Sequence, residues 1–254
     1  MKSPGYLGKC RLCDAYGPLV ASHLFPAFIY KLFVSDHRKG GSFVDLPNKC
    51  VATRQLTFPW LCARCDNEVL GGWEGVARPF LDRCMADPHS PQAYGEGVHR
   101  FAVSFAWRAG LLHMAQSDSQ AARDLLRTPL RTWKAYLSGY GADVRPFSVH
   151  AFLVIGGTFD VHKATGTEFV ERSGFLFSQL GPLFVLGMLD RSRLELHEID
   201  VWERSELRPR GGVITPVSDW KVNQEIPRTA FDQFRLHVAR TINAAEEMRL
   251  LNRI

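Results

Sequence analysis

Two short stretches, CRLC at residues 10–13 and LCARCD at residues 61–66, decide how the first part of this chain folds. Each contains a C-x-x-C motif, in which one tight turn brings two thiolates close enough to bind the same ion. Two such pairs supply the four soft ligands of a closed tetrahedral structural zinc site. We therefore expect one Zn²⁺ ion to join the start of the chain to a point roughly fifty residues further on. Its ligands would be Cys10, Cys13, Cys62 and Cys65.

The composition is typical of a globular protein of a reducing compartment. With 254 residues, of which 46% are hydrophobic, the chain can bury a sizeable core as one large or two smaller domains, and we favour two. No apolar run reaches the roughly 18 residues that span a bilayer, and the first residues lack the apolar stretch of a signal peptide. We therefore expect a cytoplasmic protein with no membrane partner. In that compartment C-x-x-C pairs are metal ligands rather than disulfides, which leaves Cys50 and Cys84 as ordinary thiols.

The texture of the sequence changes near residue 90. Residues 1–90 are rich in cysteine, glycine and proline and carry only short apolar segments, as expected where a metal replaces part of a hydrophobic core. Residues 85–97 contain the turn signals Asp87-Pro88, Ser90-Pro91 and Gly95-Glu96-Gly97, which are typical of a linker. We therefore expect a zinc-held domain at 1–90 and a second domain at 91–254, whose role would be specificity, oligomerisation or regulation.

Local patterns predict an α+β fold. In the first part we expect a short helix after Pro26 at 27–33, a strand within 51–61, and a helix from Asp66 to Cys84 that is interrupted or bent at Gly71-Gly72. In the second part the apolar spacing predicts helices at 98–116 and 119–137. Runs of β-branched and aromatic residues then predict an antiparallel sheet with strands at 147–159, 167–177, 183–189 and 194–201, followed by a last helix at 229–251.

Between the two cysteine pairs lies Ser22-His23-Leu24-Phe25-Pro26, so the chain carries the pattern S-H-x-x-P followed by L-C-x-x-C-acidic. Over roughly residues 8–84 the sequence resembles the HNH, or ββα-metal (His-Me finger), endonucleases, and it is most similar to a little-characterised bacterial subgroup with these two patterns. The resemblance implies a zinc-stabilised ββα-metal finger that hydrolyses phosphodiester bonds. His23 would match the base that deprotonates the attacking water, and Asp66 would match the ligand of a catalytic divalent ion.

Three positions depart from the common family pattern. Ser22 stands where an aspartate or histidine metal ligand is usual. Thr57 stands where the asparagine of the family usually lies, and Asp66 replaces the last histidine. Ser22 and Thr57 favour an alternative, in which the chain is a degenerate, non-catalytic zinc-finger module that binds nucleic acid or protein.

The chemistry of phosphodiester hydrolysis gives the remaining candidates their roles. The reaction needs a base, which His23 can be, although a lone histidine is also a common capping or core residue. It also needs a cation, and Asp66 offers a hard oxygen for Mg²⁺ or Mn²⁺, or else caps the following helix. Glu74 would lie about 12 Å of helical rise beyond Asp66, so it is a second ligand or an orienting residue only if the helix bends, and otherwise a surface charge.

Basic residues are candidate contacts to the nucleic-acid backbone. Arg38, Lys39 and Arg54 can donate to phosphate oxygens, although each is also an ordinary solvated residue. The pair Trp107-Arg108 could bring a guanidinium to the edge of the zinc-held part, while tryptophan there is typical of a core. A net charge of +5 permits contact with a polyanion without establishing it.

Two hypotheses from different classes follow from these patterns. The first is a metal-dependent endonuclease acting on DNA, in defence against foreign DNA or in restriction, with DNA and either a second copy of the chain or an operon-encoded protein as partners. The second is the non-catalytic zinc-finger module. His23, Asp66 and the S-H-x-x-P context favour the first.

Overall fold

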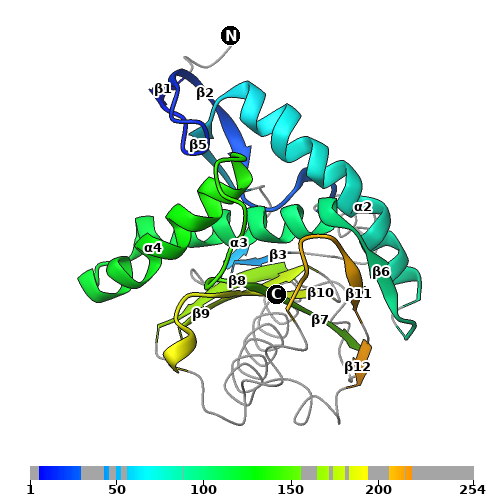
Figure 1. The fold of residues 1–254 in the computed structure, drawn as a ribbon. Helices are drawn as coiled ribbons and strands as arrows, with labels where there is room; N and C mark the ends of the chain where they lie inside the picture. Colours follow the sequence, from blue (N-terminus) through cyan, green and yellow to red (C-terminus); the bar gives the residue numbers. More distant parts are fainter. Residues whose placement is uncertain are drawn as a thin grey trace, which may run out of the picture.

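The computed structural model describes residues 6–29, 43–45, 50–52, 56–87, 89–155, 165–171, 174–180, 183–193, 206–214 and 216–218. These residues form an α+β structure of helices and mainly antiparallel sheets, as the sequence predicts. The central helix α3 (Glu96–Gln116) lies between the N-terminal strands and a larger sheet (Figure 1). The expected helix at 229–251 and the expected strand at 194–201 fall outside the described residues.

The N-terminal part is built on a three-stranded antiparallel sheet. Its strands β1 (Tyr6–Lys9), β2 (Tyr16–His23) and β5 (Thr57–Leu61) lie in that order. The separate strands β3 (Phe43–Asp45) and β4 (Cys50–Ala52) pair with each other. The prediction of a strand within 51–61 that leads to Cys62 is confirmed by β5, while β4 takes up residues 51 and 52 of the same segment. The segment lacks the strict two-residue alternation that one continuous half-buried strand requires.

A long helical segment follows the second cysteine pair. It begins as a π-helix, η2 (Arg64–Leu70), and continues as α2 (Gly71–Ala86). Gly71 has helical backbone angles, with φ −57° and ψ −34°, so the glycine pair changes the hydrogen-bonding pattern but does not interrupt the helix. π-Helical turns often lie at functional sites. The shorter helix expected after Pro26 is described only at residues 27–29, which are helical.

Helices α3 and α4 (Gln120–Leu137) agree with the prediction to within two residues. Buried residues occur on all sides of α3, and a helix that is apolar all round belongs inside a core. It contacts α2, α4 and four strands of the larger sheet. The helix therefore carries contacts from the N-terminal part to the rest of the molecule.

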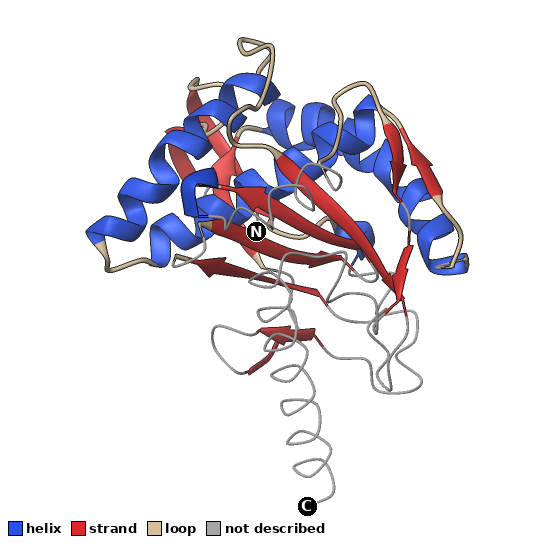
Figure 2. Ribbon diagram, turned by 60° about the horizontal axis from the view of Figure 1, so that its bottom comes forward, coloured by secondary structure: helices blue, strands red, loops and turns tan. Residues whose placement is uncertain are grey.

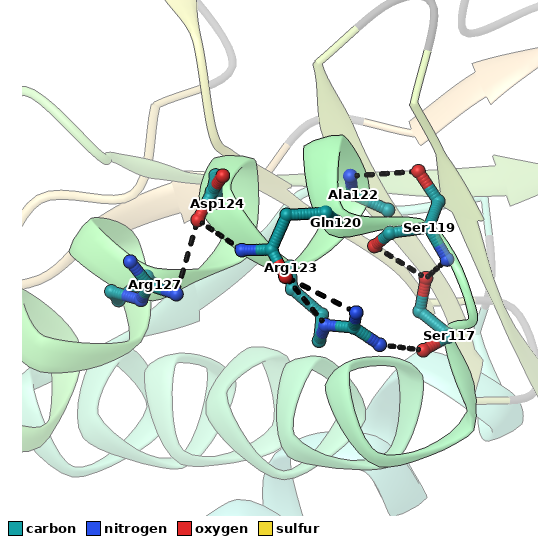
Figure 3. A network of polar contacts seen from close by, with 7 residues as sticks. All are labelled: Ser117, Ser119, Gln120, Ala122, Arg123, Asp124 and Arg127. Atoms are coloured by element: carbon teal, nitrogen blue, oxygen red, sulfur yellow. Dashed lines mark hydrogen bonds and ion pairs between the residues drawn. The ribbon is translucent and has the colours of Figure 1, made fainter.

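The turn from α3 to α4 is held by short-range polar contacts (Figure 3). Ser119 is the N-cap of α4, and its hydroxyl accepts a hydrogen bond from the backbone N–H of Ala122 at 3.2 Å. Arg123 donates to the carbonyl oxygen of Ser117 at 2.7 Å. A capping serine satisfies one of the unpaired N–H groups at the helix start. These contacts fix where α3 ends and where α4 begins.

The larger sheet has five strands, shown in red in Figure 2, and all neighbours but one are antiparallel. In spatial order they are β12 (Pro216–Ser218), β7 (Val149–Ile155), β10 (Leu183–Met188), β9 (Phe175–Leu180) and β8 (Thr165–Val170). The exception is β12, which runs parallel to β7. The run 167–177, expected to be one strand, is instead an antiparallel pair of strands whose turn includes Gly174 at φ +68°. A short 3₁₀ helix, η4 (Arg191–Arg193), follows β10.

The expected linker contains structure of its own. Within the expected linker, β6 (Gln92–Tyr94) forms a two-stranded sheet with β11 (Gly212–Ile214), which lies more than a hundred residues later in the chain. One cluster of buried hydrophobic side chains extends from Cys10 through α3 to Ile214, across the expected boundary. The division at residue 90 stays a prediction.

Close packing around α3 depends on two glycines. A Cβ atom at Gly187 of β10 would lie 2.7 Å from the Trp133 ring, and one at Gly110 of α3 would lie 2.7 Å from Leu130. Both distances are too short for real carbon contacts, so the missing side chains let α3 and α4 approach the sheet. Among the helices that the structure describes, we find none with the length and apolar character to cross a bilayer.

Candidate metal centre and the residues around it

The four cysteines predicted to bind zinc converge on one point. Their sulfur atoms all lie within 4.8 Å of one another, and the Sγ atoms of Cys13 and Cys62 are 3.9 Å apart. A tetrahedral zinc ion with Zn–S bonds of about 2.3 Å places its sulfur ligands roughly 3.8 Å apart. These cysteines are free thiols rather than disulfides. The cluster could therefore hold a metal ion such as zinc.

The first pair lies in a tight turn between β1 and β2. The N–H of Cys10 donates to the carbonyl of Ala15 at 2.9 Å, and the N–H of Asp14 donates to the carbonyl of Cys10 at 3.0 Å. Asp14 takes a left-handed conformation with φ +62°, which aspartate tolerates better than most residues. The N–H of Arg11 donates to the carbonyl of Trp60 on β5 at 2.8 Å, which joins this turn to the strand leading to the second pair.

The environment of the thiols differs across the cluster. Burial acts to raise the pKa of Cys10, but hydrogen bonds from the backbone N–H groups of Cys13, Cys62 and Leu12 lower it to about 7. Burial and the neighbouring thiols raise the pKa of Cys65. Backbone hydrogen bonds thus favour the thiolate form of Cys10. A cation bound among the sulfur atoms would supply the positive charge that keeps all four cysteines deprotonated.

Helix α4 supports the first cysteine turn from the side. Lys134 Nζ lies 2.6 Å from Asp14 Oδ2, and Ser138 Oγ donates to the carbonyl of Leu12 at 3.1 Å. Lys9 Nζ makes a second ion pair with Asp14 at 3.2 Å. Hydrogen bonds from these two lysines lower the pKa of the Asp14 carboxyl. The cluster is therefore anchored to a helix that lies more than a hundred residues away in the sequence.

His23 is the last residue of β2 and pairs with Thr57, the first residue of the neighbouring strand β5. The preceding Ser22 is buried at 1% exposure, and its hydroxyl lies 3.5 Å from the carbonyl of Val20. Because successive side chains of a strand point to opposite faces, His23 faces away from the side that buries Ser22. Ser22 and Thr57 thus lie immediately beside His23, the first along β2 and the second on the neighbouring strand β5.

Asp66 follows the last cysteine and lies in the first turn of η2, where a negative charge is favourable. Its N–H donates to the carbonyl of Cys62 at 3.0 Å. Ala63 is the N-cap of this helix, and no side chain caps it. The interpretation of Asp66 as a capping residue is therefore wrong.

Glu74, on α2, is engaged by a residue from outside the N-terminal part. Its Oε1 atom lies 3.0 Å from Arg108 Nη1, and the Glu74 side chain is 20% exposed. The same Nη1 atom donates to the backbone carbonyl of His23 at 3.0 Å. Both interpretations of Trp107-Arg108 therefore apply. Trp107 is a core residue, with 1% of its surface exposed, and the Arg108 guanidinium reaches the N-terminal part.

The Arg108 guanidinium is almost completely buried, with 2% of its side chain exposed. Its Nε and Nη2 atoms have no hydrogen-bond partner among the described residues. A buried ion pair of this kind costs several kcal/mol of desolvation per ion, and a buried donor without a partner costs about 1–3 kcal/mol more. The burial of Arg108 is therefore weak evidence for a gain in stability.

The remaining candidates are not brought into one group. In the part of the chain that is described, the four cysteines are the only set of three or more His, Cys, Asp or Glu side chains close enough to share an ion. The predicted phosphate contacts Arg38, Lys39 and Arg54 lie outside the described residues, and Cys84 is a buried free thiol away from the cluster. Catalytic roles for His23, Asp66 and Glu74 stay predictions.

Sequence reasoning missed the histidines of α3, of which His113 is half-buried. His99 is fully buried, and its Nδ1 atom lies 2.9 Å from the hydroxyl of Tyr136. Burial lowers the pKa of His99 to about 4, and burial likewise lowers the pKa of His113 to about 4. Their positions within an apolar helical run were the sequence signal that could have predicted their burial. Comparisons of the chain with family models, with curated proteins and with solved structures found no match.

Proposed function

We propose that this protein is a metal-dependent endonuclease of the HNH type that hydrolyses phosphodiester bonds in DNA. The observation that carries the proposal is the cysteine cluster, because its two turns lie beside the strand that ends at His23 and at the start of the helix that carries Asp66. An antiparallel pair, β2 and β5, followed by a helix is also the order of elements that the resemblance implies.

Each group has a separate task in this proposal. The structural zinc ion holds the two turns together and takes no part in the reaction. His23 accepts the proton of the attacking water. Asp66 holds Mg²⁺ or Mn²⁺, a cation that would neutralise the charge developing on the phosphate and the leaving oxygen. Defence against foreign DNA or restriction is the setting that fits such an activity.

The alternative is a zinc-finger module without catalysis. It is favoured by Ser22, whose side chain is buried rather than presented as a ligand, and by Thr57 beside His23. A second metal-binding group of three or more ligands is also absent from the described residues. Both hypotheses require the zinc ion, so zinc content alone does not separate them.

A plasmid-nicking assay separates the two functions. Zinc-loaded protein is incubated with supercoiled DNA in Mg²⁺ or Mn²⁺, with and without a chelator, and DNA binding is measured in parallel. The endonuclease should nick the plasmid only with added cation, and Asp66→Ala should abolish nicking while DNA binding persists, because binding comes mainly from basic residues. Binding without nicking under every condition would favour the zinc-finger module.

A further inference from the structure

Arg108, in the second part of the chain, reaches into the candidate site. It lies on α3, outside the region of resemblance at residues 8–84, yet it donates to the carbonyl of His23 and to the carboxylate of Glu74, both at 3.0 Å. A terminal guanidinium nitrogen carries two hydrogens, so Nη1 can serve both acceptors at once. One atom therefore joins the end of β2, helix α2 and helix α3.

Apolar contacts continue this arrangement along α3. Positions 101, 105 and 108 are four and three residues apart, which places them on one face of the helix. Residues 23, 25 and 28 contact α3 at positions 108, 105 and 101, so this segment and the helix run in opposite directions. The two ring pairs are Phe25 with Phe105, at 5.3 Å between centroids, and Phe28 with Phe101, at 6.4 Å. Arg108 is the polar end of this otherwise aromatic track.

The carbonyl that Arg108 holds controls the backbone of His23. Before that carbonyl, His23 is paired with Thr57 in the sheet, and after it the N–H of Leu24 donates to the carbonyl of Leu56 at 2.9 Å. Because the peptide group is planar, a hydrogen bond to the His23 carbonyl fixes the plane that follows His23. The backbone is then held on both sides of the His23 Cα atom, which fixes the direction in which its side chain leaves the strand.

Its burial argues that Arg108 serves placement rather than stability. An apolar side chain of similar volume would avoid the desolvation of a charge and would leave no unpaired donors, unlike Nε and Nη2, which find no partner among the described residues. The two hydrogen bonds that Arg108 makes to described residues both lie at the candidate site.

We propose that Arg108 is a positioning residue of this site: it holds the backbone of His23 from α3, with Glu74 as its counter-ion. Glu74 then acts through Arg108 rather than as a ligand of the catalytic cation. The effect on cleavage rests on the proposed endonuclease function, whereas the placement of His23 does not. The site is accordingly complete only with residues beyond the region of resemblance.

The test compares Arg108→Met and Arg108→Lys with the full-length wild type. Arg100→Met is the matched control, because Arg100 lies on the same helix and pairs with Glu96 at 2.8 Å instead. Three quantities are measured: zinc content, kcat and KM for a short DNA duplex with Mn²⁺, and the ¹³C-labelled histidine NMR signal of His23, assigned by its loss in His23→Ala.

In zinc-loaded Arg108→Met we expect kcat to fall about 10-fold to 100-fold while KM changes little, because a misplaced base affects the reaction more than binding. The His23 signal should move. Arg108→Lys should recover part of the activity, since an ammonium can still donate to both acceptors. Arg100→Met should leave kcat and the His23 signal as in the wild type.

A folded, zinc-loaded Arg108→Met protein with wild-type kcat and an unmoved His23 signal would overturn the proposal. If that variant does not fold, Arg108→Gln takes its place under the same criteria, because it keeps a donor but shortens the reach. If the wild type itself cleaves no DNA, the endonuclease function fails, and the His23 signal alone decides: movement in the Arg108 variant supports the positioning role, and an unmoved signal refutes it.

Discussion

The cysteine cluster and the Arg108 contact hold the same N-terminal sheet by different physical means. The cluster joins two turns through four thiols, of which Cys13 is exposed, and all four lie within residues 10–65. Arg108 reaches the sheet from α3 through a buried guanidinium, 85 positions beyond His23. The cysteine cluster therefore shapes the frame, whereas a buried ion pair sets the position of one residue within it. The two supports should fail separately and by different amounts.

Loss of the metal should have the largest effect. Cys65→Ser removes one of four ligands, so we expect zinc content to fall well below one ion per chain and residues 1–84 to unfold locally, because structural zinc contributes about 10–16 kcal/mol in zinc-finger peptides. Metal analysis and hydrogen exchange measure the two effects. Cys84→Ser is the matched control, since Cys84 is buried but lies outside the cluster, and it should keep the zinc. Full zinc content in Cys65→Ser would contradict the four-ligand site.

Loss of the buried counter-ion should have the next largest effect. Glu74→Gln leaves the Arg108 charge buried without its partner, and we expect the free energy of unfolding to fall by about 3 kcal/mol with zinc retained. The double variant Glu74→Gln/Arg108→Met should recover much of this loss, because it also removes the charge. Chemical denaturation measures the cycle. The exposed pair Arg78 and Asp82, 3.9 Å apart, gives the control, for which we expect less than about 0.5 kcal/mol. Equal effects of the two pairs would show that Arg108 is not buried as described.

Acid should separate the support given by α3 from the support given by the metal. Burial lowers the pKa of His99 to about 4, whereas a histidine in the unfolded chain titrates near 6.5. Folding therefore favours the neutral ring: its contribution is complete above pH 6.5 and is lost as the pH falls towards 4, by roughly 3 kcal/mol in total. In His99→Gln, which cannot titrate, this part of the pH dependence should disappear. The metal contributes equally to both proteins, so a difference in stability that stays constant from pH 7 to pH 4 would contradict this account.

The contact between the first cysteine turn and α4 should matter least. Asp14→Asn removes the charge that pairs with Lys9 and Lys134 but keeps a side chain that tolerates a left-handed backbone. Because these groups are partly exposed, we expect a loss of at most about 1 kcal/mol and unchanged zinc content. Thermal unfolding at low and high salt is the measurement. A loss of zinc in Asp14→Asn would mean that α4, and not only the ligands, holds the cluster together.

The sequence was most informative where structure is local. The C-x-x-C spacing places both thiols of a pair on one turn, and the apolar spacing at 98–116 and 119–137 predicted α3 and α4 to within two residues. The frame of the candidate site therefore followed from residues that are near one another along the chain. The convergence of the two pairs, which was predicted from the chemistry of a shared metal ion, is confirmed.

Prediction failed where partners are distant or where one residue decides. No local pattern shows that β12 would lie parallel to β7, or that β6 within the expected linker would pair with β11. Gly174 turns a run that otherwise resembles a single strand. The sequence allowed Arg108 to reach the N-terminal part but did not identify its partners His23 and Glu74, because these are set by how α3 packs against that part. A charged residue inside an apolar helical run was the signal for such a contact.

The most direct test of the proposed function compares cleavage by the wild type and by His23→Ala. Both proteins are loaded with zinc, shown to be folded, and given Mn²⁺ and the same DNA under single-turnover conditions. Removal of the base should lower the cleavage rate about 10²-fold or more while zinc content and stability are unchanged. Cleavage by His23→Ala at the wild-type rate would contradict the assignment of His23 as the catalytic base.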